Sequence, residues 1–129
     1  MSVLIEESDE VTLFDTGQSG EVLLHNMQEL NIDPQRITKI VLSHGHYDHT
    51  GGLQALLALI GPRPIYGHPD IFNPRFSERL DGSLKPVDMP VSKADLTDVS
   101  WHLDAQPIGV TDSVFTTGEI PRVESLEDA

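Results

Sequence analysis

The sequence contains no cysteine. This absence excludes disulfide bonds and thiolate metal sites, so any metal must be held by His, Asp or Glu. Basic residues are also scarce, because 8 Lys and Arg stand against 21 Asp and Glu, which gives a formal net charge of -13. Nucleic acids and anionic membrane surfaces are both bound through clustered Lys and Arg, so neither is an expected partner.

Long hydrophobic runs are absent as well. The longest extends from residue 53 to residue 60 and is interrupted by Gln54, which is too short for a membrane span. No charged-then-apolar signal opens the chain, so a cytoplasmic location is expected. The chain does have 129 residues with 38% hydrophobic content, enough to predict a single globular domain over residues 1–129.

Strand and helix patterns alternate along the first half of the chain. Leu23, Leu24 and Met27 recur at helical spacing after Ser19, a good N-cap residue. The β-branched run that ends at Ser43 is typical of a buried strand. The expected order is a strand hairpin at 2–6 and 11–14, a helix from 19 to 31, a strand at 37–43, a helix at 53–60 and a strand at 64–67. Such alternation predicts an α/β domain with parallel strand pairs and right-handed crossovers.

The later part of the chain has weaker patterns. Residues 69–100 are punctuated by prolines, and a short helix is predicted near 92–99 with Ser92 as its N-cap. Two late strands are predicted at 101–103 and 114–116, where short apolar and β-branched runs return.

Half of the chain's six histidines fall within one stretch, residues 44–49, directly after the buried strand. Ligands bind α/β sheets at the carboxyl ends of the strands. His44 and His46 lie two residues apart, which places both imidazoles on one side of an extended chain, and Asp48 and His49 can turn toward a second ion. Imidazole and carboxylate without thiolate suit zinc, iron or manganese. The stretch therefore predicts one or two divalent metal ions, with zinc favoured. A regulatory or storage metal site without catalysis would use the same residues.

These stretches resemble a known family. Residues 42–52 resemble the HxHxDH motif of the metallo-β-lactamase superfamily, and residues 13–17 resemble its earlier Asp motif. Residues 15–20 with 25–26, and residues 116–122, resemble the branch that contains 7,8-dihydropterin-6-yl-methyl-4-(β-D-ribofuranosyl)aminobenzene 5'-phosphate synthases. The resemblance extends over nearly the whole chain.

That resemblance implies roles for the residues of the motif. His44 and His46 would bind a first metal, and Asp48 and His49 a second. A metal-bound hydroxide would be the nucleophile, and Asp48 would be the catalytic residue that orients or deprotonates the water. Asp15 would contact the metal ligands and hold the loop in place, although a plain turn-forming role is an equal alternative for this residue.

The same resemblance implies a fold. Superfamily members are four-layer αββα sandwiches of two β-α halves with the metals at the seam, and this chain resembles roughly the N-terminal half. The second half normally supplies a third His, a bridging Asp and a final His, and no later strand-plus-His motif is found here. Two His ligands leave the first metal one ligand short of an open catalytic site. A partial sandwich would also expose an apolar sheet face, so a homo-oligomer or a companion chain is expected.

Two further residues are candidates for the site. His68 ends the predicted strand at 64–67 near the same sheet edge and would meet substrate or metal, against a capping or surface role. Arg122 would meet an anionic substrate, against a simple loop role. His25 and His102 are expected to be structural.

The expected function is that of a metal-dependent hydrolase, present here as an incomplete, truncated chain, that uses metal-activated water on a small-molecule ester, amide or phosphoester. The branch resemblance keeps synthase-like transfer chemistry open. A non-catalytic metal-binding or interaction module, or half of a split enzyme, is the alternative from another class. The later ligand motifs, which this sequence lacks, decide between an active enzyme and a binding module.

Overall fold

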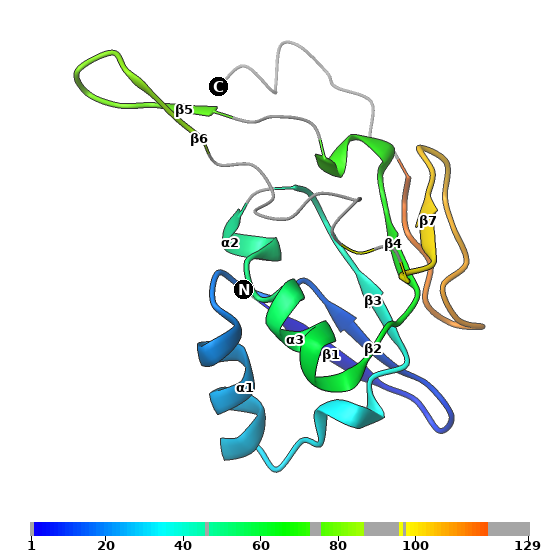
Figure 1. The fold of residues 1–129 in the computed structure, drawn as a ribbon. Helices are drawn as coiled ribbons and strands as arrows, with labels where there is room; N and C mark the ends of the chain where they lie inside the picture. Colours follow the sequence, from blue (N-terminus) through cyan, green and yellow to red (C-terminus); the bar gives the residue numbers. More distant parts are fainter. Residues whose placement is uncertain (1, 46, 73–75, 87–95, 97, 119–129) are drawn as a thin grey trace.

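The computed structural model describes residues 2–45, 47–72, 76–86, 96 and 98–118. Its centre is a five-stranded sheet in the order β1-β2-β3-β4-β7, with α1 and α3 packed on one face (Figure 1). The strands of this sheet are β1 (Val3–Glu6), β2 (Val11–Phe14), β3 (Lys39–Val41), β4 (Ile65–Gly67) and β7 (Trp101–Leu103). The helices are α1 (Gly20–Glu29), α2 (Tyr47–Thr50) and α3 (Leu53–Ile60), with the 3-10 turns η1 (Pro34–Arg36) and η2 (Pro69–Phe72).

Strand pairing confirms the predicted fold class. β1 and β2 form an antiparallel hairpin, whereas β2, β3, β4 and β7 pair in parallel. The parallel pairs align one row of residues across the sheet: Phe14, Val41, Tyr66 and His102. Because side chains alternate between the two faces, residues two positions further along project from the same face at the carboxyl edge. On β3, β4 and β7 these residues are Ser43, His68 and Asp104.

The main hydrophobic core lies between the sheet and the two longer helices. The Ser19 hydroxyl caps α1 by accepting a hydrogen bond from the Val22 N–H at 3.4 Å, as the sequence predicts. Asn31 follows this helix with a left-handed φ of 57°, which Asn adopts more readily than most residues. The fully buried side chains of this core are Leu13, Ile37, Ile40, Leu42, Leu53, Leu56, Ile65 and Ile71.

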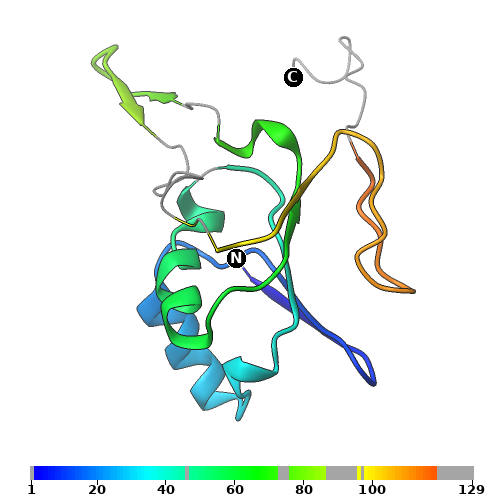
Figure 2. The same cartoon turned by 45° about the vertical axis from the view of Figure 1, so that its right-hand side comes forward.

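The opposite face of the sheet is partly covered by residues 105–118, which lie on the side away from the helices (Figure 2). Val110 is buried there against Val41 and Tyr66. The Lys39 ammonium donates to the Val110 carbonyl at 2.6 Å and lies 3.3 Å from a Glu10 carboxylate oxygen. The hydrogen bond from the Thr38 hydroxyl, with Lys39 beside it, holds the pKa of Glu10 below its ordinary value. The apolar sheet face that the sequence predicts to be exposed is therefore covered in part by the chain itself.

Several predicted boundaries are wrong. β3 is shorter than the strand expected at 37–43, because the Ser43 N–H donates to the Asp15 side chain and leaves the strand ladder. The strand expected at 114–116 is only an isolated bridge between Gly109 and Phe115.

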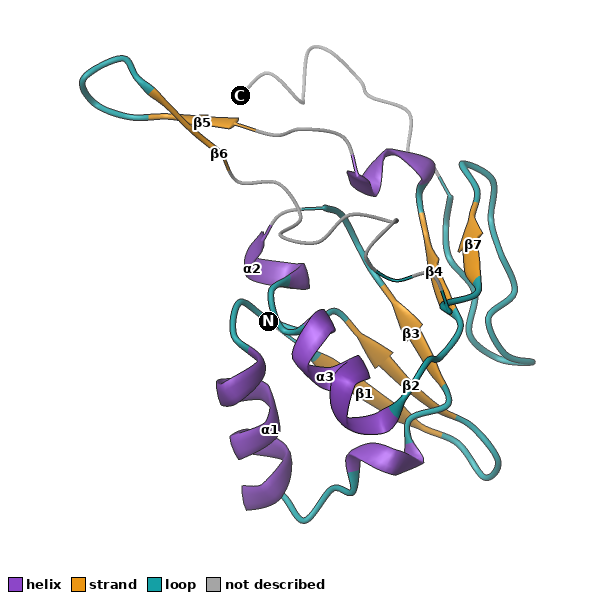
Figure 3. Cartoon of the chain, viewed as in Figure 1, coloured by secondary structure: helices purple, strands orange, loops and turns teal. Residues whose placement is uncertain are grey.

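Other segments either have a different structure from the predicted one or lie outside the described residues. α2 occupies part of the stretch expected as a loop. The helix predicted near 92–99 lies mostly outside the described residues, and Leu96 and Val99 form a turn. An unexpected hairpin, β5 (Phe76–Glu78) with β6 (Leu84–Pro86), projects away from the sheet (Figure 3). No helix in the described part of the chain is long and apolar enough to cross a membrane.

Two leucines on α3 test this packing. Leu56 is 0% exposed in the main core, whereas Leu59 is 53% exposed on the same helix. We expect Leu56→Ala to lower the free energy of unfolding by about 2–5 kcal/mol, through lost burial and the cavity left behind. The matched Leu59→Ala variant should change it by no more than about 0.5 kcal/mol. Urea denaturation followed by circular dichroism measures both, and equal effects would contradict the assigned core.

Candidate metal centre

Three neighbouring strands end at one edge of the sheet, and the candidate residues follow directly from their ends. β2 leads into Asp15, β3 into Ser43 and His44, and β4 into His68. α2, which carries His49, lies at this same edge, beyond the start of α3 (Figure 3). The parallel register therefore gathers residues that are far apart in the sequence.

Asp15 is the buried centre of this edge. Its side chain is only 1% exposed. One carboxylate oxygen accepts the Ser43 N–H at 2.8 Å, and the other meets the Ser43 hydroxyl at 2.7 Å and His49 Nδ1 at 2.8 Å. These three interactions offset the cost of burying the carboxylate. The Asp15 backbone is left-handed, with φ of 60°, a conformation that Asp reaches more readily than most non-glycine residues.

The first turn after Asp15 holds α2 in place. The Thr16 N–H and hydroxyl both donate to the His49 carbonyl, at 2.8 and 3.2 Å. The same hydroxyl accepts the Gly52 N–H at 3.1 Å. A Cβ on Gly51 would overlap the Gln18 carbonyl. Residues 15–18 and the end of α2 are therefore packed backbone to backbone, which requires glycine at this position.

The contacts of Asp15 also determine where His49 carries its proton. A carboxylate only accepts hydrogen bonds, so His49 Nδ1 must be the protonated nitrogen in its contact with Asp15. The lone pair of the neutral ring is then on Nε2. That is the form in which an imidazole binds a metal, with its other nitrogen held by a carboxylate.

His44 reaches the same form through Ser43. The Ser43 hydroxyl has one hydrogen, which it donates to Asp15. Its contact with His44 Nδ1, at 2.8 Å, must therefore be an accepted hydrogen bond. The Nδ1 nitrogen of His44 is protonated and the lone pair of the neutral ring is again on Nε2. The rings of His44 and His49 lie with their centroids 4.2 Å apart, so one buried carboxylate prepares two adjacent imidazoles for the same role.

The structure brings together some of the predicted site residues. His44, His49 and Asp15 are in contact, directly or through Ser43. His46 lies outside the described residues, as does Arg122, and only the backbone of Asp48 is described, within α2. Among the described residues, no group of three or more His, Asp or Glu is placed to hold a metal ion. The four-residue ligand set thus stays a prediction, and its described part has the donor chemistry of a metal site.

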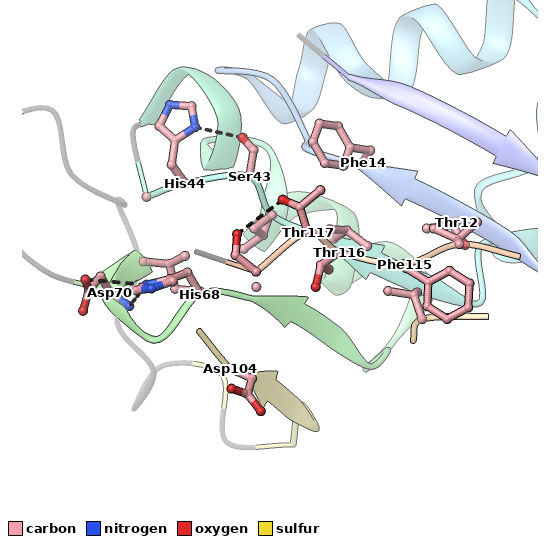
Figure 4. Close-up of a pocket in the computed structure, with 18 of the residues that line it drawn as sticks. Thr12, Phe14, Ser43, His44, His68, Asp70, Asp104, Phe115, Thr116 and Thr117 are labelled. Carbon is pink, nitrogen blue, oxygen red and sulfur yellow. Dashed lines mark hydrogen bonds and ion pairs between the residues drawn. The ribbon is translucent and has the colours of Figure 1, made fainter. Parts of the chain in front are cut away.

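A pocket of about 680 Å³ opens at this edge. Figure 4 shows His44, His68 and Asp70 at one end and Thr12 and Phe115 at the other. The second end lies between the sheet face and residues 105–118. Sequence reasoning missed Ser43 and Asp70 as site residues, although one directly precedes His44 and the other follows His68 by two positions.

An α/β sheet with two adjacent imidazoles at the carboxyl ends of its strands, held by a buried carboxylate, has the donor chemistry expected of a metal or polar-ligand site at that edge. The metallo-beta-lactamase superfamily model matches residues 1–121. The chain belongs to this superfamily.

Individual relatives agree with this assignment. The chain is 38% identical to 7,8-dihydropterin-6-methyl-4-(beta-D-ribofuranosyl)-aminobenzene-5'-phosphate synthase of Methanocaldococcus jannaschii, over 98% of this chain and 45% of that protein. It is 35% identical to Ribonuclease Z of Lactobacillus helveticus, over 73% of this chain and 31% of that protein. A metallo-beta-lactamase structure from Cronobacter sakazakii matches 84% of this chain and 43% of its own, with a TM-score of 0.58 and 22% identity, which supports the fold. The chain thus spans less than half the length of these relatives.

Replacing the buried carboxylate tests whether it prepares the two imidazoles. Asn keeps the shape and tolerates the left-handed backbone of Asp15, but its amide group is a donor that faces the donors of Ser43 and His49. We expect Asp15→Asn to weaken zinc binding about 10–100-fold, as measured by competition with a chromophoric chelator.

The matched control for this variant is Asp33→Asn. Asp33 caps η1 at an exposed position by accepting the Gln35 N–H, and Asn caps equally well. The zinc affinity of the Asp33→Asn variant should equal that of the unmodified chain. An Asp15→Asn variant with unchanged zinc affinity would show that the carboxylate does not prepare the ligands.

Proposed function

We propose that this chain carries the metal-binding part of a metal-dependent hydrolase site. The observation that supports the proposal most directly is the hydrogen-bond system of Asp15, which holds the rings of His44 and His49 through their Nδ1 nitrogens, as the other nitrogen of a metal-binding imidazole is commonly held. The proposed ligands are His44, His46, Asp48 and His49. Zinc is the favoured ion, with iron and manganese as alternatives for one or two positions.

The chemistry follows from the family and the donor set. A divalent metal held there supplies positive charge that acidifies water and polarises a substrate oxygen. Asp48 is the proposed catalytic residue, which orients the attacking water and accepts its proton. Ser43 and Asp15 hold the ligand rings, and the packed turn at residues 15–18 keeps α2 from shifting.

The proposed substrate is a small molecule with an ester, amide or phosphoester group. The pocket volume of about 680 Å³ lies within the range of small-molecule sites. Its walls join the polar end at His44 and His68 to an apolar interior at Phe14 and Val114. The net charge of -13 disfavours RNA, the kind of substrate that the name of the Ribonuclease Z relative indicates. Transfer chemistry like that named for the synthase relative is the alternative reaction, and the cytoplasm is the proposed location.

The proposal includes a companion that completes the site. The exposed apolar ring of Phe115 at the pocket supports it, because such a side chain is a candidate contact for another chain. We infer that a second copy or a companion chain packs near the pocket and contributes further ligands. A metal-binding or interaction module without activity is the rival proposal, and it shares every feature described so far.

Metal content is the first test. We expect the purified chain to retain near-stoichiometric zinc, iron or manganese by elemental analysis, and His46→Ala and His49→Ala to lose most of it, because each removes a proposed ligand. His25→Ala is the matched control, since His25 is exposed on α1 and pairs only with Glu29 among the described contacts. Absence of metal in every protein, including the unmodified chain, would overturn the proposed metal site of this chain.

Hydrolysis of bis(4-nitrophenyl) phosphate then separates the two proposals. Metal-dependent turnover, by the chain alone or with a companion, supports the hydrolase. Bound metal without turnover of phosphodiester, ester or amide probes supports the non-catalytic module.

Self-association tests the companion proposal. Phe115 lines the pocket and is 66% exposed, so it is a candidate contact for a second copy. Sedimentation velocity at increasing concentration should show reversible association, and Phe115→Ser should weaken it. The control Val22→Ser changes another exposed apolar residue, 57% exposed on α1, and should leave association unchanged. A sharply monomeric profile at high concentration would count against a second copy as the companion.

A further inference from the structure

We propose that Gly45 and the turn η2 position His44 in the candidate metal centre, through a contact between two backbones that only glycine allows. The inference deepens the proposed function, on which the role of His44 as a ligand rests. Asp15 holds the histidine-rich stretch through Ser43 and His49. η2 is a second support, which comes from the end of the neighbouring strand β4.

The backbones of Gly45 and Ile71 are in close contact. A Cβ at Gly45 would overlap the Ile71 carbonyl oxygen, and it would lie 2.9 Å from the carbonyl carbon and 3.2 Å from the Cα of Ile71. All three atoms belong to the backbone, so a change of side-chain rotamer makes no room for a larger residue. Such close approach of one backbone to another requires glycine.

η2 is anchored on its other contacts and can act as this support. The Ile71 side chain is 1% exposed in the main core, and the Ile71 N–H donates to the His68 carbonyl at 3.2 Å. The ring of Phe72 meets Trp101 of β7 edge-on, with centroids 5.0 Å apart. Two consecutive residues of η2 are therefore fixed by the sheet and its core.

A side chain at position 45 displaces the histidine rather than the turn. Protein interiors are close-packed, so moving Ile71 would disturb the main core. Ser43 is exposed and His44 is half-buried, so the stretch that carries them yields at a smaller cost. The Ser43 hydroxyl donates to Asp15 at 2.7 Å and meets His44 Nδ1 at 2.8 Å. A shift of residue 45 thus moves His44 away from the position that Asp15 and Ser43 set.

NMR of the metal-free chain tests the contact directly. The unmodified chain should show a nuclear Overhauser cross-peak between the Hα protons of Gly45 and Ile71. Two-bond proton–nitrogen spectra report the imidazole rings, and His44 is assigned by the signals lost in His44→Gln. We expect the His44 ring signals to shift in Gly45→Ala, while those of His102 on β7 stay in place. Absence of the Gly45–Ile71 cross-peak would overturn the inference, whatever the metal content.

Cobalt binding tests the positioning role. We expect Gly45→Ala to bind cobalt about 10-fold more weakly, the loss typical when a support of a metal ligand is removed. The visible absorption of the bound cobalt should also change, because it reports the geometry of the ligands. Phe72→Ala loosens η2 without adding atoms, and Phe72 is not one of the described residues that line the pocket. This second variant should lose about 3-fold in cobalt affinity.

Two controls separate positioning from general effects. Gly109→Ala is a matched glycine substitution, because the nearest atoms to a Cβ there are those of the Phe115 ring, at 3.4 and 3.6 Å, an ordinary contact. Its cobalt affinity and spectrum should equal those of the unmodified chain. Leu56→Ala destabilises the main core from α3, and the folded protein should keep the unmodified cobalt spectrum.

The possible outcomes are distinct. A folded Gly45→Ala variant with unchanged cobalt affinity and unchanged His44 signals would overturn the inference. Where Gly45→Ala does not fold, Phe72→Ala decides, and unmodified affinity and His44 signals in that variant would overturn the role of η2. If the unmodified chain binds no cobalt, the proposed function fails, while the His44 signals of the two metal-free variants still decide whether Gly45 and η2 position this ring.

Discussion

The Asp15 carboxylate is the contact on which the arrangement of this molecule depends. It lies fully buried where β2 ends, and it accepts hydrogen bonds from the end of β3 and from α2. Burying a carboxylate costs free energy unless its oxygens accept hydrogen bonds. Moving any of the three donors away would therefore leave a buried charge without a partner, and this cost holds the donors in place. The strand ladder of β3 ends at Ser43 for this reason, and the chain turns there into the histidine-rich stretch.

Strand register carries that local arrangement across the sheet. The row formed by Val41, Tyr66 and His102 places Ser43, His68 and Asp104, two positions further along, at one edge and on one face. Hydrophobic residues on the other face are covered by α1 and α3. Away from that edge, residues 105–118 cover the pocket face of the sheet. The Lys39 ammonium on β3 holds this segment by donating a hydrogen bond to the Val110 carbonyl. The pocket is therefore polar where the strands end and apolar where this segment lies over the sheet.

The histidines at this edge differ in chemistry although their residue type is the same. His49 donates to a carboxylate and His44 to a serine hydroxyl, so both present a lone pair at Nε2. His68 differs, because its Nδ1 accepts a hydrogen bond from the backbone N–H of Asp70. Membership of the metallo-beta-lactamase superfamily explains why imidazoles gather at this edge.

The sequence alone determined the alternation of strands and helices, the parallel α/β class and the position of residues 44–49 after a buried strand. These features depend on local periodicity and on β-branched runs, which are read within one segment. Tertiary structure decided the partners of Asp15, which is 28 residues from Ser43 and 34 from His49. It also decided the hydrogen-bond partners of His44 and His68, and it replaced the strand expected at 114–116 with a single bridge over the sheet. Such contacts depend on register and on side-chain packing between distant segments, which no local pattern encodes.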